Sequence, residues 1–198
     1  MARFITFEGI DGSGKTTAMA AAAKALMAQG AHVWTTREET QTPYGDLVRA
    51  SIQEGAPPLA TTYLFLADRA QHIGDIRRHL EDGPVLSDRF LHSTLAYQSV
   101  TLDGIVDDPE SFLRGLHEPL GLEPDHVVLL DLPADVAVSR VAARGLPTAY
   151  EKVAFLEKVR QKYRQLAEAE ADRFTVLDAT MDQDALAEAA ADAVRALL

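Results

Sequence analysis

An eight-residue stretch near the N-terminus constrains the fold of this chain more than any other feature. Residues 9–16 fill each fixed position of the pattern G-x-x-x-x-G-K-[ST]. An apolar, β-prone run at residues 4–7 precedes the stretch, and an alanine-rich run at residues 18–28 follows it. This strand, loop and helix context favours a phosphate-binding loop over a glycine turn with a chance Lys-Thr pair.

The residue types in this stretch suit the binding of a nucleoside triphosphate. Glycines let successive backbone N–H groups turn toward phosphate oxygens, and the following helix presents its positive end. Lys15 can reach the β- and γ-phosphates as a point charge, and the hydroxyl of Thr16 can ligate Mg²⁺. The residues expected at the nucleotide phosphates are Gly9, Ile10, Asp11, Gly12, Ser13, Gly14, Lys15, Thr16 and Thr17.

Composition narrows the class of protein. A length of 198 residues suggests a single α/β domain, and the net charge of −11 argues against a general nucleic-acid binder. The chain has no cysteine, which rules out disulfides and thiolate metal sites. We also expect no signal peptide and no membrane-spanning segment.

The remainder of the chain alternates between strand and helix patterns. A continuous apolar run at 126–131 is typical of a strand covered on both faces. The predicted fold is an α/β three-layer sandwich of the P-loop NTP hydrolase type, with a mostly parallel five-stranded sheet between helices. The expected strands are residues 3–8, 31–36, 85–87, 126–131 and 174–177, and the expected helices are 15–29, 44–53, 61–80, 93–100, 109–116, 134–144, 150–171 and 182–198.

A second group of residues follows the strand at 85–87. Asp88 and Arg89 would lie at the carboxyl end of a buried strand, where open α/β sheets bind ligands. Asp88 could hold the water ligands of Mg²⁺, and Arg89 could grip a second phosphate with its planar guanidinium. The alternative is a buried Asp–Arg ion pair with capping hydroxyls from Ser93 and Thr94.

The block from Asp88 to Gln98, with Asp-Arg-Phe-x-x-Ser-Thr-x-Ala-Tyr-Gln, resembles the signature of thymidylate kinases. The opening segment at residues 4–12, Thr36-Arg37-Glu38 and the segment at residues 64–69 resemble other parts of the same family. The resemblance extends over essentially the whole chain. It implies transfer of a phosphoryl group from ATP to dTMP, with Mg²⁺ as cofactor.

The resemblance assigns roles on the acceptor side. It implies that Phe65 stacks on thymine, that Arg69 donates to a thymine carbonyl, and that Thr94 contacts the base edge. Without it, Phe65 would be interpreted as a core residue and Arg49 equally well as a solvated helix charge. The full set expected at dTMP is Asp11, Arg49, Phe65, Arg69, Arg89, Thr94, Tyr97 and Gln98, with Tyr97 against the deoxyribose and Asp11 ordering Arg89 or touching the sugar.

The family also supplies an arginine to the transferring phosphoryl group, either from the phosphate loop or from a lid. The loop interior here contains no arginine, so the resemblance implies lid arginines, Arg140 and Arg144, in a lid segment at about residues 140–152. The expected catalytic residues are therefore Lys15, Arg89, Arg140 and Arg144, and the expected metal ligands are Thr16 and Asp88. The alternative is two solvated arginines on an amphipathic helix.

Two segments depart from the family pattern. Glu39-Thr40-Gln41 replaces the usual Pro-Gly-Gly, and the lid after Gly145 lacks an Asp-Arg pair, for which Lys152 could substitute. His92 falls near the site and is expected on a helix surface.

Three functions remain open: a thymidylate kinase, another nucleoside-monophosphate or deoxynucleoside kinase, and a P-loop nucleotide switch. The partners expected for the first are dTMP and ATP, with no nucleic acid or membrane. The expected location is the cytoplasm, because the absence of cysteine fits a reducing compartment. Family resemblance also implies a homodimer, for which the apolar helix at 63–73 could supply an interface.

Overall fold

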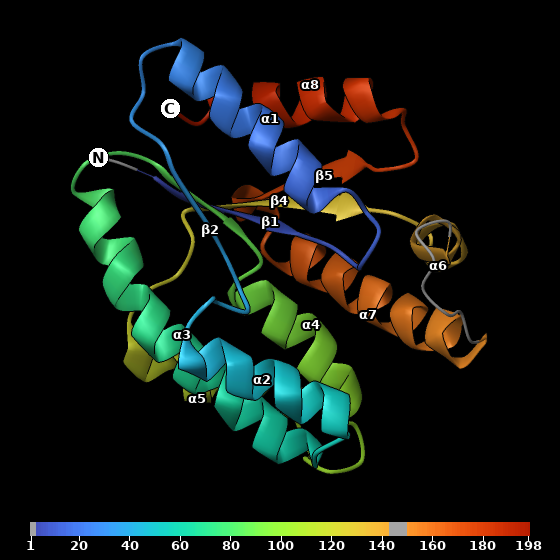
Figure 1. The fold of residues 1–198 in the computed structure, drawn as a ribbon. Helices are drawn as coiled ribbons and strands as arrows, with labels where there is room; N and C mark the ends of the chain where they lie inside the picture. The colour runs from blue at the N-terminus through green and yellow to red at the C-terminus, as the bar shows by residue number, and fades with distance from the viewer. Residues whose placement is uncertain (1–2, 143–149) are drawn as a thin grey trace.

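The computed structural model describes residues 3–142 and 150–198. Within these residues the strands form one parallel sheet in the order β2-β3-β1-β4-β5 (Figure 1). The strands are β1 (Phe4–Glu8), β2 (Trp34–Arg37), β3 (Val85–Asp88), β4 (His126–Asp131) and β5 (Phe174–Asp178). The predicted three-layer α/β class is confirmed, and all strand pairs are parallel.

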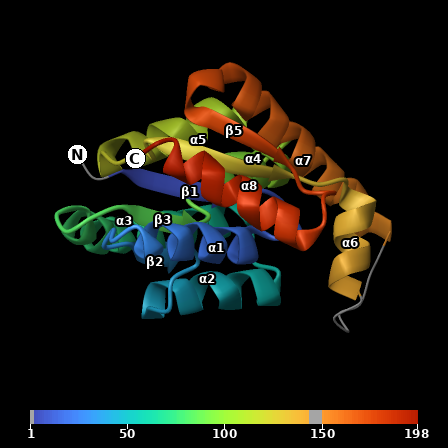
Figure 2. The same cartoon turned by 90° about the horizontal axis from the view of Figure 1, so that it is seen from above.

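Helices cover both faces of the sheet. α1 and α8 lie side by side on one face, as Figure 2 shows, whereas α4 and α7 pack together on the other. The helices are α1 (Lys15–Ala28), α2 (Pro43–Glu54), α3 (Pro58–Leu80), α4 (Leu91–Thr101), α5 (Pro109–His117), α6 (Ala134–Ala142), α7 (Tyr150–Ala169) and α8 (Gln183–Arg195), with short 3-10 turns η1 (Glu118–Leu120) and η2 (Ala171–Arg173). No helix in the described ranges combines the length and apolarity needed to cross a bilayer.

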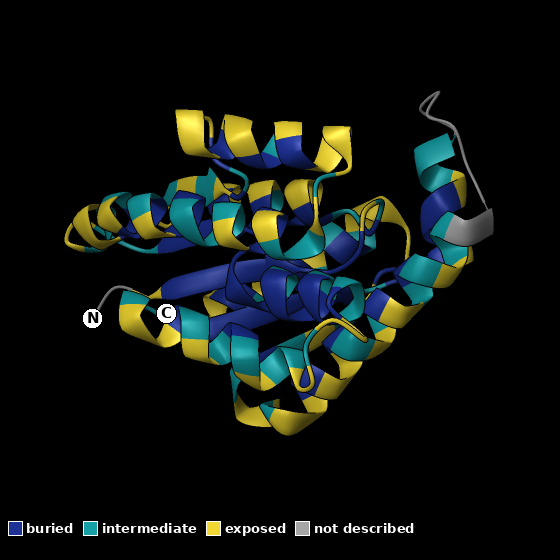
Figure 3. Ribbon diagram, turned by 90° about the horizontal axis from the view of Figure 1, so that it is seen from below, coloured by how far each residue is buried: buried dark blue, intermediate teal, exposed yellow. Residues whose placement is uncertain are grey.

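The core lies along the central strands. All five residues of β1 are buried, as are the first five of β4, because these strands have a neighbour on each side and helices on both faces (Figure 3). The edge strands β2 and β5 alternate between more and less exposed positions. The continuous apolar pattern at 126–131 therefore reports a central strand, as expected.

Element boundaries differ from the sequence prediction where tertiary pairing sets them. β2 begins at Trp34 rather than residue 31, because its ladder with β3 runs from Trp34–Val85 to Arg37–Asp88. α3 begins at Pro58, a residue suited to the first turn of a helix, rather than at residue 61. α7 ends at Ala169 and α8 at Arg195, both short of prediction.

His92 is a further correction. It is not on a helix surface but has 0% exposure, with its ring edge-on to Phe174 at 5.0 Å between centroids. Its Nε2 lies 3.4 Å from a carboxylate oxygen of Glu170, a residue 78 positions away in the chain. Nε2 therefore has a partner from a distant segment, whereas Nδ1 is buried without one in the described structure.

Candidate active site

The phosphate loop joins β1 to α1. A Cβ atom at Gly9 (φ 139°) would lie 2.6 Å from the carbonyl oxygen of Leu130, and one at Gly12 (φ 89°) would lie 2.7 Å from that of Ala137. Both positions therefore require glycine. α1 starts without a side-chain cap, so the N–H groups of its first turn are available to an anion. The buried hydroxyl of Ser13 also has no partner in the described structure.

Lys15 is folded back over the loop. Its Nζ donates to the carbonyl oxygen of Ile10 at 3.0 Å, and the residue is 6% exposed. Burial, aided by the nearby Arg89 guanidinium, lowers the pKa of Lys15 to about 7. The ammonium group is therefore poorly solvated, and an anion such as a phosphate would relieve this.

Thr16 and Asp88 meet at the carboxyl edge of the sheet. The Thr16 hydroxyl donates to Oδ2 of Asp88 at 2.5 Å. A hydroxyl and a carboxylate are hard oxygen donors, and Mg²⁺ in nucleotide sites takes few protein ligands besides waters and phosphates. The pair therefore fits magnesium. Among the described residues, no group of three or more His, Asp or Glu side chains could hold a metal ion. Magnesium at this pair would therefore need phosphate and water ligands as well.

Arg89 connects the phosphate loop to a neighbouring cavity. Its Nη2 donates to Oδ1 of Asp11 at 2.5 Å, and its Nη1 donates to the carbonyl oxygen of Gly9 and to the Ser93 hydroxyl. The guanidinium carbon lies 5.1 Å from the centre of the Tyr97 ring. The alternative of an Asp88–Arg89 ion pair is not what the structure shows, because Asp88 bonds Thr16 and Arg89 bonds Asp11.

The cavity beside Arg89 has a volume of about 370 Å³ and lies between α2, α3, α4 and α7. The expected acceptor residues that line it are Asp11, Phe65, Arg69, Arg89, Thr94, Tyr97 and Gln98. A second cavity of about 350 Å³ adds Arg37, Arg49 and Gln53. It shares with the first cavity Asp11, Glu38, Glu39, Ile52 and Arg89. The two cavities therefore adjoin, and their lining combines arginines with the carboxylates of Asp11, Glu38 and Glu39.

Arg69 has an unusual environment in this space. It is 1% exposed, its Nε and Nη2 donate to the Glu38 carboxylate, and Nη2 also donates to the Thr94 hydroxyl at 2.9 Å. Its Nη1 is buried and has no partner in the described structure. A buried donor without a partner is costly, so it marks a place for an acceptor atom from a ligand.

Comparisons with known proteins identify the family of the chain. A sequence model described as thymidylate kinase matches residues 7–189. The chain belongs to the thymidylate kinase family. It is 43% identical over 197 residues to a probable thymidylate kinase of Natronomonas pharaonis, with 98% of each chain covered. It is 40% identical over 193 residues to a probable thymidylate kinase of Methanospirillum hungatei, covering 96% of this chain and 93% of that one.

Most of the residues that the thymidylate kinase family pattern predicts for the acceptor side lie together in the structure. Phe65 is half-buried and lines the larger cavity instead of joining the core. Burial raises the pKa of Tyr97 to about 12, so its hydroxyl stays protonated, and that buried oxygen has no partner in the described structure. Arg49 lines only the smaller cavity, where its Nη1 donates to the carbonyl oxygen of Thr40 at 2.8 Å.

The lid residues of the family pattern are only partly described. Arg140 is half-buried on α6, the helix whose Ala137 carbonyl approaches Gly12 of the phosphate loop, but it lines neither cavity. Arg144 lies outside the described residues, as does the side chain of Tyr150. Lys152 is described, and its ammonium group contributes to the lowered pKa of Asp11, after the larger effect of Arg89.

Sequence reasoning missed several residues of this thymidylate kinase site. Phe155 of α7 lines the larger cavity, yet it sits in an ordinary amphipathic helix pattern that gives no signal of a ligand. Glu8 is buried and accepts hydrogen bonds from the Phe90 amide, the Ser93 hydroxyl and the Tyr163 hydroxyl. Burial raises the pKa of Glu8 despite those bonds. Its position directly before the phosphate loop was the one signal available.

Proposed function

We propose that the protein transfers the γ-phosphoryl group of ATP in line to the 5′-phosphate of dTMP, giving dTDP and ADP. The phosphate loop would hold ATP, and the larger cavity would hold dTMP. Asp11 and Arg89 line both cavities and adjoin the loop, which supports a continuous path between the two nucleotides. The dTMP phosphate is already anionic, so positioning and charge stabilisation suffice without a strong general base.

The observation that carries the proposal is the buried, unpartnered Nη1 of Arg69. Arg69 lines the larger cavity. Its Nη1, turned to a base there, would donate and not accept, so it would suit the 4-oxo group of thymine and disfavour the 4-amino group of cytosine. Phe65, in the same cavity, would stack on the ring, and Tyr97 would lie against the deoxyribose. Thr94 and Gln98 would bind polar atoms of the nucleoside.

Arg89 would bind the dTMP phosphate, with Arg49 reaching it from the smaller cavity. Asp11 orients Arg89 through the bond at 2.5 Å, so it acts on the phosphate through the arginine. Lys15 would neutralise the transferring group from the ATP side, and its low pKa favours release from its present burial toward a phosphate.

We propose Mg²⁺ as the cofactor, held by Thr16 and Asp88 together with the ATP phosphates. Magnesium bound there would offset the charge of the β- and γ-phosphates. Arg140 and Arg144 would add positive charge from a lid at about residues 140–152 of a single domain. The loop at residues 178–182 would lie beside adenine; it precedes α8, whose Leu186 borders Gly14.

We further propose a cytoplasmic homodimer. Both substrates are metabolites of the cytoplasm. Tyr44 and Leu47 on α2 and Tyr63 on α3 are large apolar side chains that are about half exposed, and they suit a subunit contact. Light scattering after size exclusion would show twice the mass of 21.5 kDa if this holds.

A coupled assay of ADP release tests the reaction. Acceptors would be dTMP, dUMP, dCMP, dGMP, AMP and thymidine. We expect dTMP to be preferred over dUMP by about 10–200-fold, the range for one methyl group, and to be preferred more strongly over the others. Equal turnover of AMP and dTMP would indicate another nucleoside-monophosphate kinase, preference for thymidine would indicate a nucleoside kinase, and turnover independent of any acceptor would favour the nucleotide switch.

A further inference from the structure

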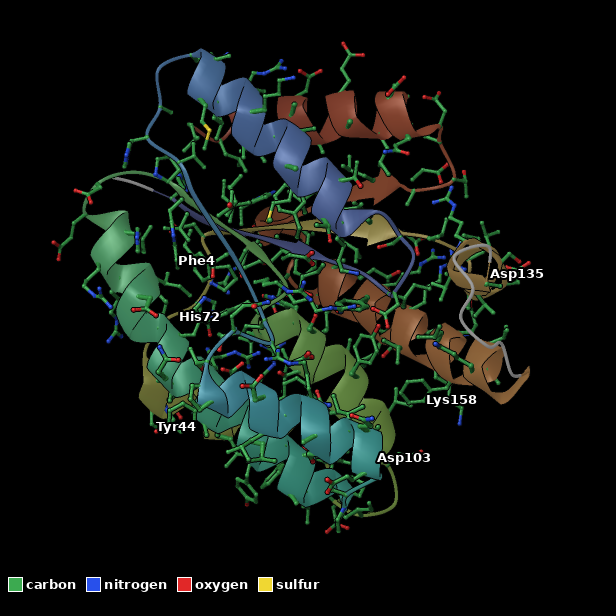
Figure 4. All side chains as sticks on the ribbon, viewed as in Figure 1. Phe4, Tyr44, His72, Asp103, Asp135 and Lys158 are labelled. Atoms are coloured by element: carbon green, nitrogen blue, oxygen red, sulfur yellow. The ribbon has the colours of Figure 1, made fainter. Side chains whose placement is uncertain are left out.

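A row of buried polar side chains runs from the edge of the sheet to Arg69. On β2, the Thr36 hydroxyl lies 2.7 Å from Nε2 of His72. Nδ1 of His72 lies 3.2 Å from Oε1 of Glu38, and Glu38 is paired with Arg69. His72, labelled in Figure 4, comes from α3 and is 2% exposed. Glu38 lines both cavities, whereas His72 lines neither.

The direction of these hydrogen bonds follows from the charge of Glu38. Burial alone would raise the pKa of its carboxyl, but the Arg69 guanidinium and the bond from His72 hold that pKa below its ordinary value. An ionised carboxylate only accepts, so Nδ1 of His72 carries the proton and donates to Glu38. Nε2 of His72 pairs with the Thr36 hydroxyl at 2.7 Å.

This arrangement fixes the plane of the Arg69 guanidinium. Glu38 takes the Nε and Nη2 donors, Thr94 takes another from Nη2, and the Phe90 ring lies 4.8 Å from the guanidinium carbon. In the described structure Nη1 is the guanidinium nitrogen without a partner, and Arg69 lines the larger cavity. If the carboxylate of Glu38 moved or rotated, the guanidinium would turn with it and a different N–H edge would face the base.

We propose that Glu38 and His72 are positioning residues that hold Nη1 of Arg69 toward the base and so set the preference for a 4-oxo over a 4-amino pyrimidine. The inference rests on the proposed function. A loosened guanidinium loses its bond to the oxo group of dTMP and also its repulsion of the amino group of dCMP. The ratio of the two kcat/KM values must then fall, whereas a loss of folded protein would lower both values equally.

Three variants separate these effects. His72→Phe keeps an aromatic ring but removes the donor to Glu38. His72→Asn places an amide N–H where Nδ1 was and restores that donor. His126→Phe is the matched control, because His126 is another buried histidine whose Nε2 lies 2.8 Å from a threonine hydroxyl, on β4 and lining neither cavity.

The measurement is kcat and KM for dTMP, dCMP and ATP. For His72→Phe we expect the dTMP-to-dCMP ratio of kcat/KM to fall about tenfold, the effect of one hydrogen bond to a charged group. KM for dTMP should rise while KM for ATP stays constant. His72→Asn and His126→Phe should keep the wild-type ratio within about twofold. Glu38→Asp retains the charge that pairs with Arg69 but shifts it by one methylene, so we expect it to lower the ratio as well. This variant tests the proposal if His72→Phe does not fold.

Two outcomes overturn the inference: a wild-type ratio in folded His72→Phe and Glu38→Asp, or a ratio in His72→Asn that falls as far as in His72→Phe. The proposed function fails in a different way, because wild-type protein would then release no ADP in response to dTMP. A wild-type enzyme that prefers dTMP, together with unchanged variants, would refute only the positioning roles.

Discussion

Lys15 provides a test in which function and stability oppose each other. We expect Lys15→Met to make the protein more stable at pH 7 while lowering turnover by at least about 100-fold, as removal of a catalytic charge does. Methionine is unbranched and apolar, so it fits the buried position. The carbonyl oxygen of Ile10 loses the Lys15 bond but still accepts from the Ser13 amide at 3.2 Å.

The size of the effect follows from the pKa of Lys15. One pH unit between the folded and unfolded pKa values corresponds to about 1.4 kcal/mol, so the gap from 10.5 to about 7 amounts to about 4 to 5 kcal/mol. The lost hydrogen bond offsets about 1 kcal/mol. We therefore expect a net gain of about 3 to 4 kcal/mol at pH 7.

The dependence on pH has a defined sign. Between about pH 7 and pH 10.5 the unfolded chain binds more protons at Lys15 than the folded chain does, so wild-type stability rises with pH across this window. Methionine does not titrate. The advantage of Lys15→Met should therefore shrink by about 2 kcal/mol between pH 7 and pH 9.

The assay is urea unfolding followed through Trp34, the single tryptophan, without nucleotide, phosphate or Mg²⁺. Lys24→Met, the same change at an exposed position of α1, should alter neither the stability at pH 7 nor its trend with pH. A Lys15→Met protein no more stable than wild type at pH 7, or with the same advantage at pH 7 and pH 9, would contradict a charge penalty at Lys15.

Three further predictions concern other parts of the molecule. Phe65→Ala should raise KM for dTMP by about 5- to 150-fold, the worth of one stacked base, and steady-state kinetics should show an unchanged KM for ATP. Asp88→Asn should raise the Mg²⁺ concentration needed for half-maximal turnover by about tenfold or more, which a magnesium titration measures; a shift below twofold would contradict a role in metal binding. Glu170→Gln should destabilise the protein by about 1 to 3 kcal/mol at pH 7, because the bond to His92 and the pairing with Arg114 lower the pKa of Glu170 to about 2. That stabilisation is present above the unfolded pKa of about 4.5 and is lost as the pH falls toward 2, so urea unfolding should give a smaller difference at pH 4 than at pH 7.

The sequence alone was sufficient to predict the structural features that depend on a local residue pattern. The phosphate loop, the buried strand β4 and the alternation of strands and helices follow from residues close together in the chain. These features determine a parallel sheet with its ligand edge at the ends of β1 and β3. The start of β2 was wrong by three residues, because its ladder with β3 rather than its own composition decides where pairing begins.

The candidate site was predictable residue by residue only where a family motif covers it. The partners of those residues come from distant segments: Glu38 lies 31 positions from Arg69, and Glu8 lies 155 positions from Tyr163. No periodicity in the sequence reports such pairs. Phe155 was missed for the same reason, since a helix pattern does not say which of its apolar residues faces a cavity instead of the core.

Arg89 shows why these distant partners matter to the site. It has φ 76°, a left-handed conformation that is unfavourable for a residue with a side chain, by about 1 to 2 kcal/mol. A glycine would remove that strain but would also remove the guanidinium that joins the loop to the cavity. Glu8 stabilises the turn, because its carboxylate accepts hydrogen bonds from the Phe90 amide at 2.8 Å and from the Ser93 hydroxyl at 2.6 Å. The buried acid, itself disfavoured by desolvation, and the strained arginine therefore stabilise each other. The fold gives up stability at both positions to hold one cation at the junction of two cavities.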